Sequence, residues 1–243
     1  EDLVVVDHRN HRAVDGVSFQ VQAGEIVGVA GVQGNGQTEL VEAITGLRLP
    51  ISGTIRLDGE EITHTSPRHR HRAGMAHVPE DRQRDGLVLD FDLTENLGLD
   101  AYYDRPYSRG IVMNWVEARR HAEELVEQYD VRTPSVDVLA SHLSGGNQQK
   151  LIVAREFARE TKLIVASQPT RGVDVGSIEY IHQRIVEERD QGAAVLIVSS
   201  ELDEIMALSD RILVMYRGRI VAETTPSETN HGQMGLYMAG QTA

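Results

Sequence analysis

Short apolar runs alternate with amphipathic stretches in the last third of the chain. Leu163–Ala166 and Val195–Val198 are continuously apolar, and each precedes a stretch with apolar residues at helical spacing, the first at 178–185 and the second at Glu201–Leu208. Fully apolar strands separated by helices predict a parallel sheet that is covered on both faces. Arg211–Ala222, with a glycine turn at its middle, predicts a closing hairpin.

The start and the middle of the chain follow other patterns. At the start, Val17, Phe19 and Val21 alternate with polar residues, as in half-buried antiparallel strands. From about Leu87 to Glu160 the spacing of apolar residues is helical. One predicted buried helix face consists of Trp115, Ala118, Ala122, Leu125, Val126 and Tyr129. Together these patterns predict an α/β protein with a helical insertion.

Composition narrows the classes of function. The 243 residues include 24 basic and 37 acidic side chains, so the formal charge is −13. This charge disfavours generic nucleic-acid binding, which depends on neutralising phosphates. The absence of cysteine rules out disulfides, thiolate zinc sites, iron–sulfur clusters and thiol nucleophiles. No apolar run approaches the roughly 18 residues of a membrane-spanning helix.

The segment Glu25–Leu47 carries the most informative motif. A short apolar strand, Ile26–Ala30, leads into a glycine-rich loop and then into an amphipathic helix. Glycines allow successive backbone N–H groups to turn inward around an anion, and the helix adds its positive end. The spacing matches the phosphate-binding loop G-x-x-x-x-G-K-[ST]. The predicted nucleotide-binding residues are Gly31, Gly34, Asn35, Gly36, Gln37 and Thr38, with the Thr38 hydroxyl as a potential Mg²⁺ ligand.

One position of this loop departs from the motif, because Gln37 stands where lysine is expected. The change removes a charge from the β- and γ-phosphates but keeps the backbone amides and Thr38. Since a hydrogen bond from a charged group contributes roughly 1.5–3 kcal/mol, we expect nucleotide binding that is weakened but not lost. The structural alternative is a glycine-rich turn that only joins a strand to a helix.

A second motif, Leu-Ser-Gly-Gly-Asn-Gln-Gln-Lys at Leu143–Lys150, precedes a helical run, and a later apolar strand ends in Ser-Gln-Pro-Thr at Ser167–Thr170. A phosphate loop, LSGG before a helix, and an apolar strand ending in x-x-Pro-Thr, in this order, resemble the nucleotide-binding domain of ATP-binding cassette (ABC) transporters. The resemblance covers nearly the whole chain. It implies that residues 1–243 form one P-loop NTPase domain with the ABC ATPase fold. That fold has a mostly parallel, RecA-like sheet core, an antiparallel β subdomain and a helical subdomain, here inserted at about 88–160.

In that family two such domains face each other head to tail, and each ATP lies between the phosphate loop of one domain and the LSGG segment of the other. When the family's catalytic positions are matched to this sequence, the resemblance implies that the chain's own ATP site is degenerate, because its catalytic residues are replaced. Ser167 stands at the position of the magnesium aspartate, Gln168 at that of the catalytic glutamate, and Ser200 at that of the switch histidine. Glu80 stands where the family has a glutamine that senses the γ-phosphate and the permease. Because a carboxamide cannot accept a proton as a carboxylate does, we expect little ATP hydrolysis at this site.

The residues that would complete a partner's site are intact. Ser144, Gly145 and Gly146 would bind, in trans, the ATP held by the partner's phosphate loop, and Asp174, at the family's D-loop, would lie across the same interface. This asymmetry resembles the second cassette of the tandem-cassette ATPases that power bacterial importers of simple sugars and nucleosides. The first residue, Glu1, is not a methionine, and we expect the first cassette upstream of it.

The resemblance also implies partners and a location. Segments such as GNGQTEL and VPEDR are most similar to the nucleoside branch, and the simple-sugar branch is the alternative. The implied partners are the first cassette of the same longer chain, transmembrane permease subunits and, indirectly, a substrate-binding lipoprotein. ATP and Mg²⁺ are the implied cofactors, and no nucleic acid is expected. The implied location is peripheral, at the cytoplasmic face of the bacterial plasma membrane. A nucleotide-binding regulatory domain and a soluble ABC protein of translation or DNA repair are the other candidates.

Two further features have structural alternatives. His8–Arg12 and Arg68–Arg72 are rich in histidine and arginine, but no carboxylate or cysteine cluster accompanies them, so solvated basic loops are favoured over metal or anion sites. In members of the family, the region that corresponds to Leu87–Leu99 faces the permease. It is therefore a candidate docking surface, with core packing as the alternative.

Overall fold

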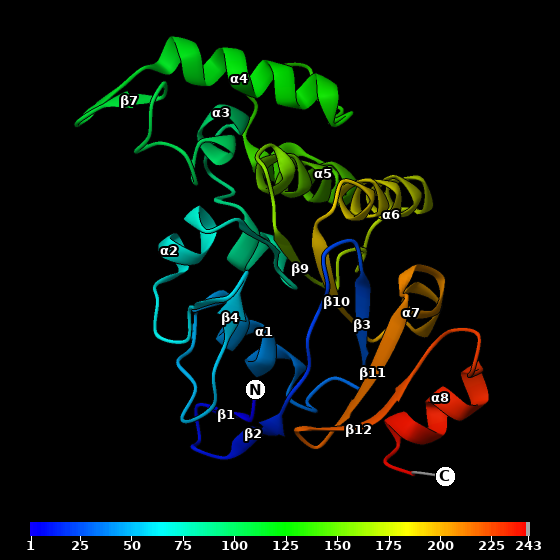
Figure 1. Cartoon of the computed structure of the whole chain (residues 1–243). Coiled ribbons are helices and arrows are strands. Elements are labelled where there is room, and N and C mark those ends of the chain that lie inside the picture. Colours follow the sequence, from blue (N-terminus) through cyan, green and yellow to red (C-terminus); the bar gives the residue numbers. More distant parts are fainter. Residues whose placement is uncertain (242–243) are drawn as a thin grey trace. The chain divides into compact units, whose positions relative to one another are not determined.

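The computed structural model describes residues 1–241, which form two compact units. Unit 1 comprises Glu1–His77, Thr161–Gln168 and the chain from Ile185 on, and unit 2 comprises Val78–Glu160 and Pro169–Arg184. The chain leaves unit 1 twice and returns to it twice, and Figure 1 labels the elements of both units. In this described part of the chain, no helix has both the length and the apolar character needed to cross a membrane.

A six-stranded sheet forms the centre of unit 1, in the order β12-β11-β3-β10-β9-β6. Its strands are β3 (Ile26–Ala30), β6 (Met75–Val78), β9 (Leu163–Ser167), β10 (Ala194–Ser199), β11 (Arg211–Tyr216) and β12 (Arg219–Thr224). Strand β3 runs parallel to β10 and β11, and β10 runs parallel to β9. The pair β11–β12 is antiparallel. The predicted apolar strands, parallel sheet and closing hairpin are thereby confirmed.

Different helices cover the two faces of this sheet. Helix α1 (Gln37–Thr45) shares a buried core with Val27 and Val29 of β3. Gly28, which alternates with them, lies so close to side chains at helix α7 (Leu202–Leu208) that a Cβ atom would overlap them. Successive residues of a strand point to opposite faces, so β3 is apolar throughout because each of its faces is covered.

Small antiparallel pairs complete the β structure of unit 1. Strand β1 (Leu3–Val6) pairs with β2 (Arg12–Val17), and β4 (Arg56–Leu57) pairs with β5 (Glu60–Glu61). The predicted strand alternation at Val17, Phe19 and Val21 is wrong beyond Val17, where β2 ends. Phe19 and Val21 are instead partly buried against the core of unit 1, which explains their apolar character without a strand. Helix α8 (His231–Met238) packs near β11.

Unit 2 is mainly helical. Its elements are η1 (Arg82–Gly86), α3 (Leu93–Leu97), β7 (Ser108–Arg109), β8 (Val112–Met113), α4 (Trp115–Gln128), η2 (Ala140–His142), α5 (Gly145–Phe157) and the first part of α6 (Val175–Asp190). Helix α4 buries Ala118, Ala122 and Leu125, as its spacing predicts. Trp115 is 54% exposed, so the core position predicted for it is wrong. As the first residue of α4, it lies at the rim of a cavity rather than inside the packed face.

The basic segments differ from each other. His8–Arg12 is exposed, as predicted for a solvated loop. The prediction is wrong for Arg68–Arg72, because this segment lies in helix α2 (Pro67–Arg72), whose cap is Ser66. Helical spacing turns Arg70 inward, where it is fully buried.

Arg70 satisfies the C-terminal end of α1. Its guanidinium donates hydrogen bonds to the carbonyl oxygens of Ala43 and Ile44, at 2.5 and 2.6 Å, and to that of Thr63 at 2.9 Å. Gly46, which ends α1 with a φ of 83°, gives the arginine room, since a Cβ atom there would lie 2.9 Å from its Nε. A cation at this end also interacts favourably with the helix dipole. Burial lowers the pKa of Arg70, but an arginine stays charged at neutral pH.

Replacing this buried cation is expected to destabilise the protein. Arg70→Ala leaves three buried carbonyl groups without their donor and opens a cavity, so we expect the free energy of unfolding to fall by about 3 kcal/mol. Urea unfolding followed by circular dichroism measures the change. Arg68→Ala, on the same helix but exposed, is the matched control and is expected to change stability by less than about 0.5 kcal/mol. Equal stability of the two variants would contradict the structural role of Arg70.

Candidate functional site

Three parallel strands of unit 1 end side by side. The register pairs Ala30, the last residue of β3, with Ser199, the last of β10, and it pairs Val198 with Ser167, the last of β9. Segments that follow the carboxyl ends of parallel strands meet at one edge of the sheet, where open α/β sheets bind ligands. The residues that follow these three strands are Gly31, Ser200 and Gln168.

The loop after β3 has the backbone of a phosphate cradle. Gly34 and Gly36 have φ angles of 89° and 102°, which few residues other than glycine adopt. A Cβ atom on Gly36 would lie 2.0 Å from the carbonyl oxygen of Ala13, so only glycine fits there. The carbonyl and side-chain oxygens of Asn35 each accept a hydrogen bond, at 2.9 Å, from the backbone of the β11–β12 turn. The loop is therefore fixed in shape by the surrounding strands of unit 1.

The side chain of Gln37 is folded back into this loop. Its Nε2 donates a hydrogen bond to the carbonyl oxygen of Val32, and its Oε1 accepts one from the backbone N–H of Asn35, both at 3.1 Å. Gly31 passes so close that a Cβ atom would lie 2.3 Å from this Nε2. The carboxamide oxygen of Gln37 thus accepts a hydrogen bond from the N–H of Asn35, a group that the motif would present to a phosphate. The glycines still fit a phosphate group, with the exposed Thr38 at the start of α1.

Gln168 and Ser200 are brought together at the ends of β9 and β10. Gln168 adopts a left-handed backbone conformation, with a φ of 48°, and its N–H donates to the carbonyl oxygen of Val198 at 2.7 Å. Its Oε1 accepts hydrogen bonds from the N–H and the hydroxyl of Ser200, both at 3.3 Å. These are the positions at which the resemblance predicts the catalytic glutamate and the switch histidine. A neutral amide beside a hydroxyl offers no group that can take a proton from water at neutral pH.

The side chains at these positions fit a magnesium ion poorly. Mg²⁺ is usually held by carboxylates together with substrate phosphates. Thr38, Ser167 and Gln168 supply hydroxyl and amide oxygens instead, and Ser167 is buried at the end of β9. Within residues 1–241, no group of three or more His, Asp and Glu side chains is arranged to hold a metal. The loop therefore suits phosphate binding better than metal-assisted hydrolysis.

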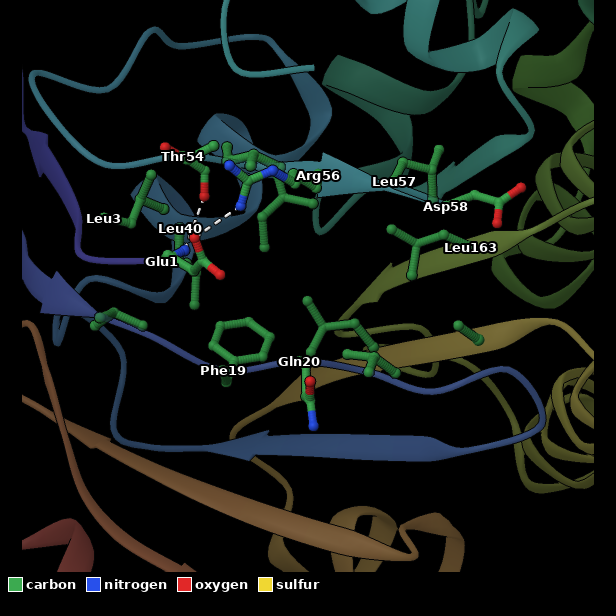
Figure 2. Close-up of a pocket in the computed structure, with 16 residues that line it drawn as sticks. Glu1, Leu3, Phe19, Gln20, Leu40, Thr54, Arg56, Leu57, Asp58 and Leu163 are labelled. Carbon is green, nitrogen blue, oxygen red and sulfur yellow. Dashed lines mark hydrogen bonds and ion pairs between the residues drawn. The ribbon is translucent and has the colours of Figure 1, made fainter. Parts of the chain in front are cut away.

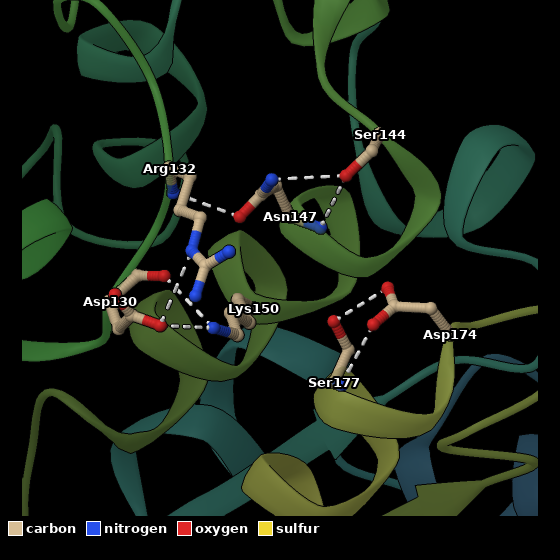
Figure 3. A network of polar contacts seen from close by, with 7 residues as sticks. All are labelled: Asp130, Arg132, Ser144, Asn147, Lys150, Asp174 and Ser177. Carbon is tan, nitrogen blue, oxygen red and sulfur yellow. Dashed lines mark hydrogen bonds and ion pairs between the residues drawn. The ribbon is translucent and has the colours of Figure 1, made fainter.

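The signature segment lies in unit 2, at the start of α5. Figure 3 shows Ser144 and Asn147 of this segment. The Oγ of Ser144 caps the helix by accepting hydrogen bonds from the N–H of Asn147 at 3.4 Å and from its Nδ2 at 3.0 Å. The Oδ1 of Asn147 in turn accepts a hydrogen bond from the backbone N–H of Arg132 at 2.8 Å. Ser144 is exposed, Gly145 is half-buried and Gly146 is buried. An exposed serine at a helix N-terminus is a suitable end for binding an anion.

Asp174 lies beside this segment within unit 2. A Cβ atom on Gly146 would lie 2.4 Å from the Oδ2 of Asp174. The carboxylate accepts hydrogen bonds from the hydroxyl of Ser177 at 2.8 Å and from its N–H at 3.1 Å (Figure 3). These bonds hold the pKa of Asp174 below its usual range, so the group is ionised at neutral pH. Glu80, also in unit 2, forms an ion pair with Arg171 at 2.7 Å.

Two polar anchors of the signature helix were missed by the sequence analysis. Asn147 connects the cap of α5 to Arg132, and the buried Lys150 donates to the carbonyl oxygen of Asp130 at 3.0 Å and to its carboxylate at 2.6 Å. The Lys150 ammonium also lies 4.4 Å from the ring centre of Tyr180. The bond from Lys150 lowers the pKa of Asp130. Asn147 and Lys150 both lie in the signature motif, but no sequence pattern predicts that they contact Arg132 and Asp130.

Cavities outside these segments belong to other parts of each unit. One cavity, of about 320 Å³, lies in unit 1 and is lined by Leu3, Phe19 and Leu40 (Figure 2). The ion pair of Arg56 with Glu1, at 2.8 Å, borders it. No residue of the phosphate loop lines it. A second cavity of about 320 Å³ lies in unit 2, between α3, α4 and the hairpin of β7 and β8. Neither cavity forms part of the candidate nucleotide site.

A family model described as ABC transporter matches residues 14–171. The chain belongs to the ABC transporter family. The matched region includes the phosphate loop, the signature segment and β9. The ABC ATPase fold predicted from the sequence is confirmed by solved structures. One of them is a dimeric, post-hydrolysis state of an ATP-binding cassette bound to ADP and phosphate. It has a TM-score of 0.78 and 22% identity, over 93% of this chain and 97% of that chain.

Curated ABC relatives are similar over nearly the entire chain. The guanosine import ATP-binding protein NupO of Bacillus subtilis is 51% identical over 100% of this chain and 48% of its own length. The nucleoside import ATP-binding protein NupA of Lactococcus lactis is 50% identical over 99% and 47%. The glucose import ATP-binding protein TsgD13 of Haloferax volcanii is 46% identical over 98% and 44%. The chain thus spans about half the length of the curated relatives that it matches.

The folded-back Gln37 predicts the effect of restoring the motif. Gln37→Lys removes one of the two acceptors of the Asn35 N–H, leaving the carbonyl oxygen of Val32 at 3.3 Å, and returns a cation to the loop. We expect nucleotide affinity to rise about tenfold or more, because a charged hydrogen bond contributes roughly 1.5–3 kcal/mol. Titration with a fluorescent ATP analogue measures the affinity. The control is Gln33→Lys, which adds the same charge at an exposed position of the loop. Equal affinities in the two variants would show that charge alone, and not this position, is responsible.

Proposed function

We propose that the chain is the second cassette of a tandem ABC importer ATPase and that its signature segment completes the hydrolytic site of the first cassette. One observation carries the proposal. An exposed, capped signature serine in unit 2 coexists with Gln37 in the phosphate loop of unit 1 and with Ser167, Gln168 and Ser200 at the ends of its strands β9 and β10. The tandem arrangement is supported by the relatives, which are about twice as long as the segment they share with this chain.

In the proposed pair, the ATP on the first cassette's phosphate loop meets Ser144 and the glycines that follow it. The positive end of α5 and the serine hydroxyl stabilise the negative charge that the γ-phosphate carries during transfer. This chain's own loop binds ATP as a clamp that holds the pair closed, since Gln168 cannot act as a general base. ATP binding closes the pair and hydrolysis opens it, which drives a permease between its two access states.

We assign nucleosides as the transported class, with simple sugars as the alternative. Two relatives named for nucleoside or guanosine import are 50% and 51% identical, and one named for glucose import is 46% identical. Selectivity resides in the permease and in a substrate-binding lipoprotein, so transport assays on the assembled importer decide between the classes. The chain works as a peripheral protein at the cytoplasmic face of the bacterial plasma membrane.

In the proposed importer, the surface that faces the permease is Leu87–Leu99 in unit 2. Within the predicted docking segment, Leu93 and Leu97 are buried, whereas Val88 and Phe91 are partly exposed. Phe91 also borders the apolar cavity beside α3. An exposed apolar patch at the mouth of a cavity is typical of a surface that receives a partner's side chain. The segment therefore serves core packing and docking through different residues.

The isolated chain is expected to hydrolyse ATP at near-background rates. Gln168→Glu alone is not expected to restore activity, because Gln37, Ser167 and Ser200 still lack the charge and proton-transfer groups that the reaction uses. Phosphate release by the purified chain, with and without the substitution, measures this. Brisk turnover by either protein in the absence of a partner would contradict the degenerate site.

The trans role predicts the effect of Ser144→Arg in the complete tandem protein. A long cation at this position blocks the approach of the partner's triphosphate, so we expect steady-state hydrolysis to fall about 100-fold or more, as when a transition-state donor is lost. Nucleotide binding by this chain's own loop, followed with a fluorescent analogue, is expected to persist. Ser141→Arg, at an exposed position three residues earlier, is the matched control. Unchanged turnover in Ser144→Arg would refute the proposal.

A further inference from the structure

A short hairpin of unit 2 presents apolar side chains to solvent. It consists of β7 and β8, and Ile111 at its tip is completely exposed, which is the highest exposure of any large apolar side chain in residues 1–241. Val112 is 67% exposed, and Trp115 and Val116, the first two residues of α4, are 54% and 81% exposed. Figure 1 shows the hairpin, labelled β7, beside the start of α4. We call these four residues the tip patch.

The hairpin that carries the patch is held by hydrogen bonds and by a ring contact. Its two strands pair in antiparallel register, and the N–H of Asn114 donates to the carbonyl oxygen of Tyr107 at 2.8 Å. The ring of Tyr107 lies 5.2 Å, between ring centres, from that of His121 on α4. Gly110 has a φ of 68°, which is typical of the first position in a two-residue hairpin turn. The apolar side chains are therefore exposed on a regular turn that packs against α4.

Two arginines without ion-pair partners accompany the patch. The whole chain has a formal charge of −13, but residues 105–116 include Arg105 and Arg109 and no acidic side chain. Both arginines are exposed, and in the part of the chain that the structure describes neither forms an ion pair. Arg119 and Arg120, further along α4, are instead paired with carboxylates of unit 2. Arg105 and Arg109 therefore remain available to an anion outside the chain.

An exposed apolar patch marks a surface that binds either a protein or a membrane. A stable protein interface takes roughly 20–30 residues from each partner, whereas the tip patch is four residues on a projecting turn. Tryptophan is enriched at the membrane–water interface. Arginine is attracted to anionic lipids, while neighbouring apolar side chains enter the boundary between headgroups and acyl chains. An apolar tip with one tryptophan and two unpaired arginines therefore fits a negatively charged lipid surface better than a protein.

We propose that the tip patch inserts into the surface of a membrane that contains anionic lipids and that Arg105 and Arg109 bind the lipid phosphates. The inference rests on the peripheral membrane location in the proposed function and adds the residues through which the chain itself contacts lipid. Trp115 borders the same cavity of unit 2 as Phe91 of the proposed docking segment, so the two surfaces are neighbours. One signal of this kind gives weak and reversible binding, which supplements attachment through a permease.

The fluorescence of Trp115 reports on the patch directly, because it is the only tryptophan of the chain. The purified 243-residue chain is mixed with vesicles of equal parts phosphatidylglycerol and phosphatidylcholine. We expect the emission of Trp115 to shift to shorter wavelength, and we expect lipids brominated on their acyl chains to quench it. We also expect the chain to sediment with these vesicles, less so with phosphatidylcholine alone, and less as the salt concentration is raised.

Two double variants separate the apolar and the charged parts of the contact. Ile111→Ser with Val112→Ser removes the inserted apolar surface, so we expect vesicle affinity to fall about tenfold or more. Arg105→Gln with Arg109→Gln is expected to lower the affinity for anionic vesicles about tenfold or more and to abolish the preference for phosphatidylglycerol. All four side chains are exposed, and circular dichroism is expected to show unchanged folding.

The matched controls change exposed residues of the same types in unit 1, and we expect them to bind vesicles as the parent chain does: Leu47→Ser with Leu49→Ser, and Arg9→Gln with Arg12→Gln. No binding by the parent chain, or equal binding by tip variants and controls, would overturn the proposal. Tip variants that retain vesicle binding but fail to assemble with permease subunits would assign the patch to a protein partner instead. The turnover of Ser144→Arg tests the proposed function independently, so either idea fails without the other.

Discussion

The register of three parallel strands is the constraint on which the chemistry of unit 1 depends. Because β3 and β9 both pair with β10, their last residues are aligned, and the segments that follow them meet at one edge of the sheet. This alignment brings Gln168 to Ser200 at hydrogen-bond distance and sets the phosphate loop on the neighbouring strand. The sheet thus places Gln168 and Ser200, two neutral side chains, at the edge where open α/β sheets bind ligands. The strand register is that of a ligand-binding edge, but Gln168 and Ser200 carry no charge there.

The neutral side chains at these positions find hydrogen-bond partners within unit 1. Gln37 fills part of the phosphate loop with its own carboxamide, and Gln168 accepts both hydrogen bonds from Ser200. Each of these contacts contributes only about 1 kcal/mol. These side chains therefore have polar partners without a ligand, in keeping with the proposal that this loop binds nucleotide for closure.

The sequence predicted the elements that depend on local patterns and missed those that depend on long-range contacts. Apolar strands, the amphipathic α1 and the glycine-rich loops have signatures within a few residues, and the structure confirms them. Arg70 carries no such signature, because its partners are carbonyl groups at Ala43 and Ile44, which are distant in sequence. Trp115 follows the helical spacing of α4, and the helix is present as predicted. The spacing does not show, however, that the first turn of α4 lies outside the packed core. The candidate site residues were found through motifs, whereas the contacts of Asn147 and Lys150 required coordinates.

The separation of polar contacts between the units bears on how the proposed cassette works. The phosphate loop and its neutral companions bond within unit 1, and Glu80, Arg82, the signature serine and Asp174 bond within unit 2. The proposed nucleotide site and the proposed trans role of the signature therefore depend on different sets of contacts. On this argument, loss of catalysis at one site and retention of control over another are compatible, since different units of one cassette carry them.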